Sequence, residues 1–298
     1  MRWNCSNMVE TGETSMNHII GCLDGSIYSQ SVCDHALWLA QRLGSDIELL
    51  QVLDHHREHA SIANFSGAIG FKSNEALMEQ LTEVEEAQAR VGLAKGRAIL
   101  RECAGRLRAA NATVSTTQLN GSLVETLTAR ETRDSIVVLG KRGEAADFAK
   151  LHLGANLERV ARASICPILA AARTFRPIER VLIAHDGGTS IRKAMEFLTH
   201  SPLLRSLHVQ ILTIGTPDQA RRAQLDDAKA QIERCGAIVT TRIEPGDPET
   251  TIARITEQDG FGLLVIGAYG HSRIRNLVIG STTTAMLRSC RIPVLMVR

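Results

Sequence analysis

The sequence predicts an α/β protein made of two tandem, doubly wound domains, each a five-stranded parallel sheet with helices on both faces. Two observations predict this fold class. Short runs rich in Val, Ile and Leu alternate with longer helical segments, which is typical of parallel sheets that are buried on both faces. The order of these runs also occurs twice along 298 residues, a length that allows two domains with their own cores.

The repeat is clearest at the strands that open and close each half. Residues 18–26 (HIIGCLDGS) resemble residues 180–188 (RVLIAHDGG), and both runs end in Asp-Gly. Residues 135–140 (SIVVLG) resemble 262–267 (GLLVIG), and 165–169 (ICPIL) resemble 291–295 (RIPVL). Because the landmarks recur in the same order, we interpret the chain as a duplication.

Each half is expected to contain five strands that alternate with helices. The strands predicted for the first half are Ile19–Leu23, Ile47–Leu53, Thr113–Leu119, Ile136–Leu139 and Ile168–Ala171. Those predicted for the second half are Val181–Ala184, Val209–Ile214, Ile238–Ile243, Leu263–Ile266 and Val294–Val297. A helical pattern follows the first strand of each half, over Ser31–Arg42 and Ile191–Leu198.

The predicted domains are residues 17–173 and 178–298, joined near the segment RTFRP at 173–177. Residues 1–16 are polar and aperiodic, which indicates a loose N-terminal tail. The first half is the larger because a segment near 54–81 follows its second strand and precedes a long helix that runs through Arg108.

Composition indicates which classes of protein to exclude. Lys and Arg number 34 against 32 Asp and Glu, and aromatic residues make up 3%, so we expect no nucleic-acid partner. The seven cysteines form no Cys-x-x-Cys pair, which favours a reducing compartment. No apolar run reaches membrane-spanning length and no secretory signal pattern opens the chain, so we expect a cytoplasmic protein without membrane contact.

A glycine-rich stretch near the C-terminus has the features of a phosphate site. Gly267 and Gly270 follow an apolar strand, and Gly280 precedes the hydroxyl residues Ser281 and Thr282 at an expected helix start. Glycine lets a ligand approach the backbone closely, and the first amides of a helix have no partners within it. Together with the helix dipole, these amides favour a bound phosphate.

The spacing Gly-x2-Gly-x9-Gly-Ser resembles the ATP-binding motif of the universal stress protein family. The strand ending at Asp186 and the final Ile-Pro-Val run also fit this family, over almost the whole chain and in two copies. The resemblance implies a role in stress survival, ATP or another adenine nucleotide as ligand, with Mg²⁺ as an optional companion, and pairing of two domains through their last strands. That pairing can occur within a tandem chain, and a homodimer is a further option. The cofactor-binding residues implied by the resemblance are Ala184, His185, Asp186, Ile214, Gly267, Gly270, Gly280, Ser281, Thr282 and Thr283.

The first half departs from this motif. Gly140 and Gly143 are present, but ten residues instead of nine precede Gly154, and Ala-Asn replaces the hydroxyl pair. Asp24 is retained, and Lys141-Arg142 offers positive charge for an anion or, alternatively, a solvated turn. We therefore expect one competent nucleotide site per chain, in the second half, with the first half binding ATP poorly or taking another ligand.

Several single residues have structural explanations as well. Ser281 is a common helix N-cap, and Asp186 is a common turn residue. Arg273 and Arg275 could neutralise phosphate or lie in solvent, and His271 is a weaker candidate. The cluster His55, His56 and His59 with Glu58 has helical spacing for a metal, although a solvated polar segment explains it better.

Three functional classes remain open from the sequence. The first is a nucleotide-binding sensor or scaffold with at most slow hydrolysis or self-phosphorylation, because no general base and nucleophile are evident. The second is an enzyme that uses the nucleotide for hydrolysis or adenylation. The third is an interaction module that binds no nucleotide. The P-loop, the Gly-x-Gly-x-x-Gly fingerprint and the Gly-x-Ser-x-Gly elbow are all missing from the sequence.

Overall fold

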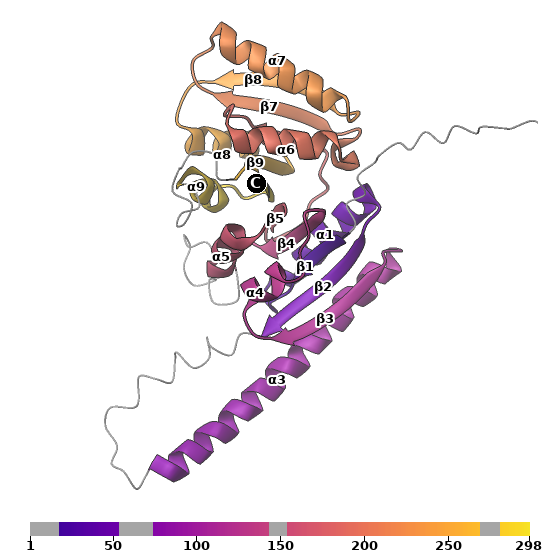
Figure 1. Ribbon diagram of the computed structural model, residues 1–298, viewed down its shortest axis with the longest axis vertical. Coiled ribbons are helices and arrows are strands. Elements are labelled where there is room, and N and C mark those ends of the chain that lie inside the picture. The colour runs from indigo at the N-terminus through magenta and orange to yellow at the C-terminus, as the bar shows by residue number, and fades with distance from the viewer. Residues whose placement is uncertain (1–17, 54–73, 143–153, 269–280) are drawn as a thin grey trace, which may run out of the picture.

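The strands form one ten-stranded sheet in the order β3-β2-β1-β4-β5-β10-β9-β6-β7-β8 (Figure 1). The computed structural model describes residues 18–53, 74–142, 154–268 and 281–298. Every pair of neighbouring strands is parallel except β5 and β10, which pair antiparallel at the centre. The order 3-2-1-4-5 is thus present twice, and the predicted fold class of two tandem, doubly wound halves is confirmed.

The observed strands agree with the predicted ones to within one residue at each end. The strands of the first half are β1 (His18–Cys22), β2 (Asp46–Leu53), β3 (Val114–Asn120), β4 (Ser135–Gly140) and β5 (Ile168–Ala171). Those of the second half are β6 (Arg180–Ala184), β7 (His208–Ile214), β8 (Ile238–Glu244), β9 (Leu263–Gly267) and β10 (Val294–Val297).

Helices connect the parallel strands. In the first half they are α1 (Ser29–Leu43), α3 (Asn74–Ala109), α4 (Leu123–Thr128) and α5 (Ala155–Ala163). In the second half they are α6 (Thr189–Thr199), the 3₁₀ turn η3 (Pro202–Leu204), α7 (Gln219–Glu233), α8 (Pro248–Gln258) and α9 (Ser281–Ser289). Several begin at side-chain caps: the carboxylate of Asp218 accepts from the Arg221 amide, and that of Asp247 from the Thr250 amide.

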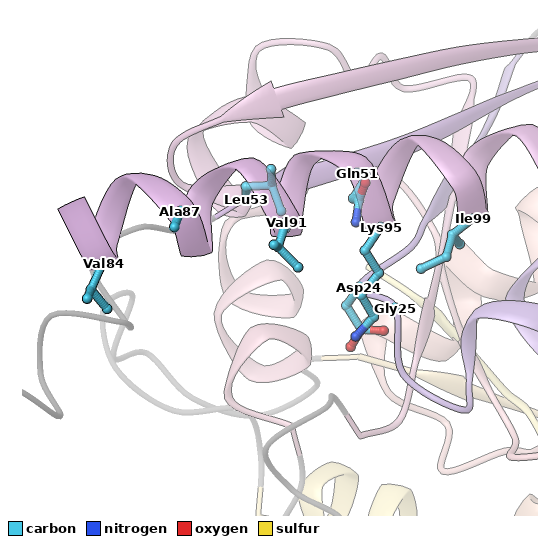
Figure 2. A pocket seen from close by; sticks show the side chains of 10 residues that line it. Asp24, Gly25, Gln51, Leu53, Val84, Ala87, Val91, Lys95 and Ile99 are labelled. Atoms are coloured by element: carbon cyan, nitrogen blue, oxygen red, sulfur yellow. The ribbon is translucent and has the colours of Figure 1, made fainter. Parts of the chain in front are cut away.

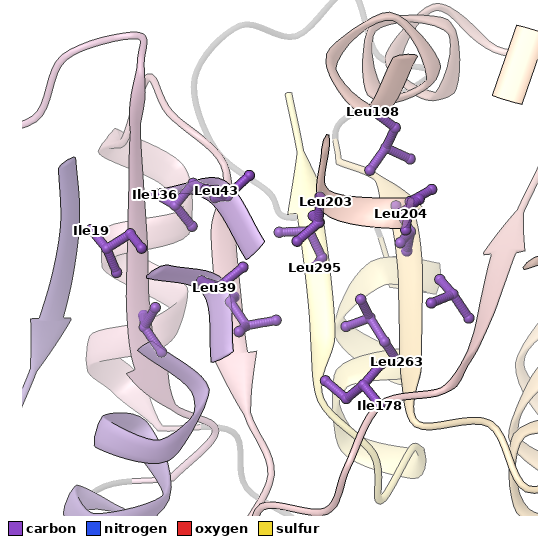
Figure 3. Close-up of a cluster of buried hydrophobic side chains, with 14 of the residues drawn as sticks. Ile19, Leu39, Leu43, Ile136, Ile178, Leu198, Leu203, Leu204, Leu263 and Leu295 are labelled. Atoms are coloured by element: carbon purple, nitrogen blue, oxygen red, sulfur yellow. The ribbon is translucent and has the colours of Figure 1, made fainter. Parts of the chain in front are cut away.

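Two apolar cores cover the two faces of the sheet. Successive residues of a strand point to opposite faces, so Ile19 joins the core beneath α1, α3, α6 and α7, while Ile20 joins the core beneath α4, α5, α8 and α9. Figure 3 shows the first of these cores where the halves meet, with Leu39 of α1 on one side and Leu263 and Leu295 on the other. Each core is therefore continuous across both halves.

The segment predicted between the second strand and the long helix is only partly described. Residues 54–73 lie outside the described part of the chain. The helix α3 begins at Asn74, so residues 74–81, which we assigned to the inserted segment, belong to the helix itself.

Polar contacts also join the halves. The guanidinium of Arg42, in the last turn of α1, donates to the main-chain oxygens of Leu203 and Arg205. Arg298 donates to the oxygens of Arg162, at 3.0 Å, and Ser164, at 3.2 Å. Each of these side chains donates hydrogen bonds to carbonyl oxygens of the opposite half, which helps to align the halves about the β5–β10 pair.

Two sequence expectations concern the chain as a whole. Within the described ranges, no helix combines the length and the apolar character needed to cross a membrane. The six cysteines in those ranges are free thiols, and five of them are buried.

Candidate functional site

The candidate site of the second half lies where β6, β7 and β9 end. Ala184 is in register with Leu212 of β7 on one side and with Ile266 of β9 on the other. His185, Asp186 and Ile214 continue these strands at the same edge. The structure therefore brings together the described residues that the sequence grouped, at the edge where doubly wound sheets bind ligands.

Gly267 is required by a close approach of two backbones. A Cβ at this position would lie 2.5 Å from the amide nitrogen of Ile191 and 2.7 Å from the carbonyl carbon of Ser190. Both contacted residues belong to the first turn of α6. A side chain here would therefore push β9 away from α6, so the packing of these two elements requires glycine at position 267.

The main chain of His185 forms hydrogen bonds through both its amide and its carbonyl group. Its amide donates to the oxygen of Leu212 at 2.8 Å, and its own oxygen accepts from the Thr213 hydroxyl at 2.9 Å. Burial lowers the pKa of the imidazole below its usual range, against an opposing effect of the Asp186 carboxylate. The ring is therefore neutral at neutral pH and contributes no positive charge to the site.

Asp186 has a structural role that Asp24 shares. Its Oδ1 accepts from the Gly188 amide at 2.8 Å, and Asp24 Oδ1 accepts from the Ser26 amide at 3.0 Å. Both side chains are exposed. This contact occupies one carboxylate oxygen as a turn partner, and a second carboxylate oxygen has the chemistry to bind a ribose hydroxyl or a hydrated Mg²⁺.

The helix α9 begins at the hydroxyl residues that close the predicted motif. It begins at Ser281, and because it precedes β10, which is parallel to β9, its N-terminus lies at the same sheet edge as Gly267. Thr283 is buried in its first turn. The side chains of Ser281 and Thr282 are not described, and Gly270, Gly280, His271, Arg273 and Arg275 lie outside the described residues.

The corresponding place in the first half is built differently. The ammonium group of Lys141, which follows β4, donates to the main-chain oxygens of Cys290 at 2.7 Å and Ile292 at 2.6 Å. Burial lowers the pKa of Lys141 to about 8. Our expectation that Lys141 holds an anion or lies in a solvated turn is wrong, because the side chain is buried against the opposite half.

The first half has a hollow at the ends of β1 and β2, with a volume of about 500 Å³. Figure 2 shows Asp24 and Gly25 facing Lys95 of α3 across it, with Gln51 and Leu53 of β2 close by. Val84, Val91 and Ile99 of α3 also line it, so its wall is largely apolar. The sequence analysis did not predict this hollow, because no local pattern shows that α3 lies beside the ends of β1 and β2.

No group of three or more metal-binding side chains lies within the parts of the chain that the structure describes. The candidate cluster His55, His56 and His59 with Glu58 falls outside those parts.

Comparison with known proteins identifies the family. A model of the universal stress protein family matches residues 16–171 and 199–298. A universal stress protein of Synechocystis sp. is 38% identical over 287 residues, which cover 95% of this chain and 100% of that protein. This chain belongs to the universal stress protein family. The family resemblance proposed from the sequence is therefore confirmed.

Solved structures share the fold of nearly the whole chain. A universal stress protein from Archaeoglobus fulgidus DSM 4304 matches with a TM-score of 0.66 at 21% identity, covering 95% of this chain and 97% of that one. A protein of unknown function from Pseudomonas aeruginosa PAO1 matches with a TM-score of 0.61 at 16% identity, over 96% and 93% of the two chains. At these identities the likeness concerns the fold alone.

Proposed function

We propose that this universal stress protein binds ATP or another adenine nucleotide in its second half and acts in the stress response as a sensor or scaffold. The observation that carries the proposal is the meeting of Gly267, Asp186 and the start of α9 at one sheet edge. A glycine at a strand end, an exposed carboxylate and the first amides of a helix are a suitable set for a nucleoside triphosphate.

The roles of the individual residues follow from their positions. Ala184, His185 and Ile214 end the two strands beside the site and offer an apolar, uncharged surface for the base. The α9 amides, with Ser281, Thr282 and the glycine loop, would hold the phosphates. Asp186 would bind the ribose or Mg²⁺ through the carboxylate oxygen that Gly188 does not use.

Features of the first half favour a single nucleotide site per chain, in the second half. Its motif has a longer loop and lacks the hydroxyl pair. Its basic residue Lys141 is engaged by Cys290 and Ile292. We therefore propose that this half supports the second through the β5–β10 pair, which here joins two domains of one chain.

The identity of the small molecule that co-purifies with the intact protein tests the ligand class. Mass spectrometry of the heat-released fraction is expected to find an adenine nucleotide. ATP at about 100 times its Kd is also expected to stabilise the folded protein by about 2.7 kcal/mol. If no nucleotide is recovered and ATP leaves the melting temperature unchanged, the protein is an interaction module instead.

The enzyme alternative is tested separately by turnover. The proposal expects ATP hydrolysis to remain close to the uncatalysed background. Hydrolysis or adenylation well above background, abolished by Asp186→Ala, would replace the binding function with a catalytic one.

A further inference from the structure

The first part of α3 extends beyond the domain to which it belongs. The helix has 36 residues, which corresponds to a length of about 54 Å. Its second part packs on the sheet through the buried side chains of Leu100, Cys103, Ala104 and Leu107. Figure 1 shows the first part running past the ends of β2 and β3, with no other described helix or strand beside it.

This extension carries exposed apolar side chains at a regular spacing. Val84 is 50% exposed and Val91 is 67% exposed, and the two are separated by seven residues, or two helical turns. In the close-up of Figure 2 both project from the same side of α3 as Ile99. Apolar side chains that recur at this interval form the seam between two paired helices. Exposing these valine side chains to water is unfavourable, and a partner that buried them would gain hydrophobic stabilisation.

The charges of α3 are divided along its length. Residues 74–86 contain five Glu and no Lys or Arg, whereas residues 87–109 contain six Lys or Arg and one acidic residue, Glu102. The helix dipole favours this distribution only within the first and last turns. Glu83, Glu86 and Arg90 lie well inside the helix, beyond the turns where the dipole acts.

We propose that α3 pairs antiparallel with α3 of a second copy of this chain. In this arrangement Val84 packs against the partner's Val91, and the two-fold axis repeats the same contact with the roles exchanged. Glu83 and Arg90 are also seven residues apart and both are exposed, so the same register brings Glu83 beside the partner's Arg90. A parallel pair in register would instead place each Glu83 opposite the partner's Glu83.

The ion pair that Arg90 makes within α3 is weak. Arg90 Nη2 lies 3.1 Å from Glu86 Oε2 on the same helix, with both side chains mostly exposed. Ion pairs of this exposed kind contribute roughly 0–1 kcal/mol, so exchanging it for a contact across the dimer costs little. The acidic start of each α3 then lies along the basic part of the other, which favours the antiparallel orientation over the parallel one.

Disulfide cross-linking of the full-length chain tests the orientation. Cys5 is first changed to Ser, and the two single variants Val84→Cys and Val91→Cys are then oxidised separately and as a mixture. The mixture is expected to give a linked dimer of one variant with the other, while each variant alone gives much less. Preferential linking of Val84→Cys with itself would establish a parallel pair, and no linking in any sample would exclude the α3 interface; either result overturns the proposal.

Sedimentation of charge variants tests the same interface without new cysteines. Wild-type protein is expected to form a dimer at micromolar concentrations, Glu83→Arg to lose at least tenfold in dimer affinity, and the double variant Glu83→Arg/Arg90→Glu to regain most of it. Ile238→Lys is the matched control, because Ile238 is 54% exposed on the edge strand β8, far from α3. Loss of the dimer in this control, or no effect of Glu83→Arg, would contradict the proposal.

Discussion

The ammonium nitrogen of Lys141 lies 2.7 Å from the main-chain oxygen of Cys290, across the junction between the two halves of the chain. Lys141 follows β4, as Ala268 follows β9, so the two positions correspond in the duplication. The amide of each donates to the last residue of the neighbouring strand, Ala171 or Val297. Only the first half has a basic side chain there, and this side chain binds the chain at the C-terminal end of α9, the helix that begins at the proposed nucleotide site.

Lys141→Met tests the energetic role of this contact through pH. The pKa of Lys141 is about 8 in the folded chain because of burial, against a usual value of 10.5. Between these values the unfolded chain keeps the proton and the folded chain has lost it, so raising the pH favours folding. The free energy of unfolding of the wild type, relative to that of Lys141→Met, is therefore expected to rise by up to about 3 kcal/mol over this range. Urea unfolding at a series of pH values measures it, and a constant difference would show that Lys141 keeps its usual pKa.

His35 is expected to make the protein sensitive to acid. Burial lowers its pKa, its Nδ1 lies 2.7 Å from the Ser31 oxygen, and its Nε2 has no hydrogen-bond partner among the described atoms. The folded state keeps the ring neutral while the unfolded chain takes up a proton near the usual pKa of 6.5. Stability is therefore fully present above that pH and falls as the pH drops toward the folded-state pKa, by at most about 1.4 kcal/mol per pH unit.

Chemical unfolding at neutral and mildly acidic pH compares the wild type with His35→Gln. The variant keeps a polar group near Ser31 and cannot titrate, so its stability is expected to change less with pH. Equal changes in the two proteins would assign the acid sensitivity to other groups.

Gly267→Ala is expected to destabilise the second half by about 1–3 kcal/mol, the usual cost of overpacking. The added Cβ meets the backbone of Ile191 at 2.5 Å, where no flexible side chain can move aside. Gly105→Ala in α3 is the control, because a Cβ there has no atom within 4 Å. That change is expected to stabilise the protein by about 0.5–1 kcal/mol. Thermal unfolding of both variants measures the contrast, and a Gly267→Ala variant as stable as the wild type would contradict the close approach of β9 and α6.

The strands were predictable because they are buried on both faces. Runs such as Val181–Ala184 must be apolar at every position, and this pattern is distinct from that of an amphipathic helix. The duplication then supported these strand assignments, since the second half repeats the landmarks of the first. Asp186 and Gly267 could be grouped for the same reason, because parallel strands bring their carboxyl ends to one edge.

Other features of the structure depend on contacts between distant segments, which local sequence patterns do not predict. The ammonium group of Lys141 donates to the main-chain oxygen of Cys290, 149 positions away in the sequence. The sequence around Lys141 is equally consistent with a polar turn. The start of α3 was placed too late: the helix begins at Asn74, and its first part runs past the ends of β2 and β3 (Figure 1). In both cases the prediction was wrong because the feature depends on the arrangement of the whole molecule and not on the local segment.

The central claim is that one chain has one nucleotide site, in its second half, and calorimetric titration of the intact protein with ATP tests it most directly. Asp186→Asn and Asp24→Asn form a matched pair, because each aspartate accepts from a main-chain amide two residues later in the chain. We predict one ATP per chain, with affinity reduced at least tenfold by Asp186→Asn and unchanged by Asp24→Asn. Two equivalent sites per chain, or a single site that is lost with Asp24→Asn instead, would contradict the account.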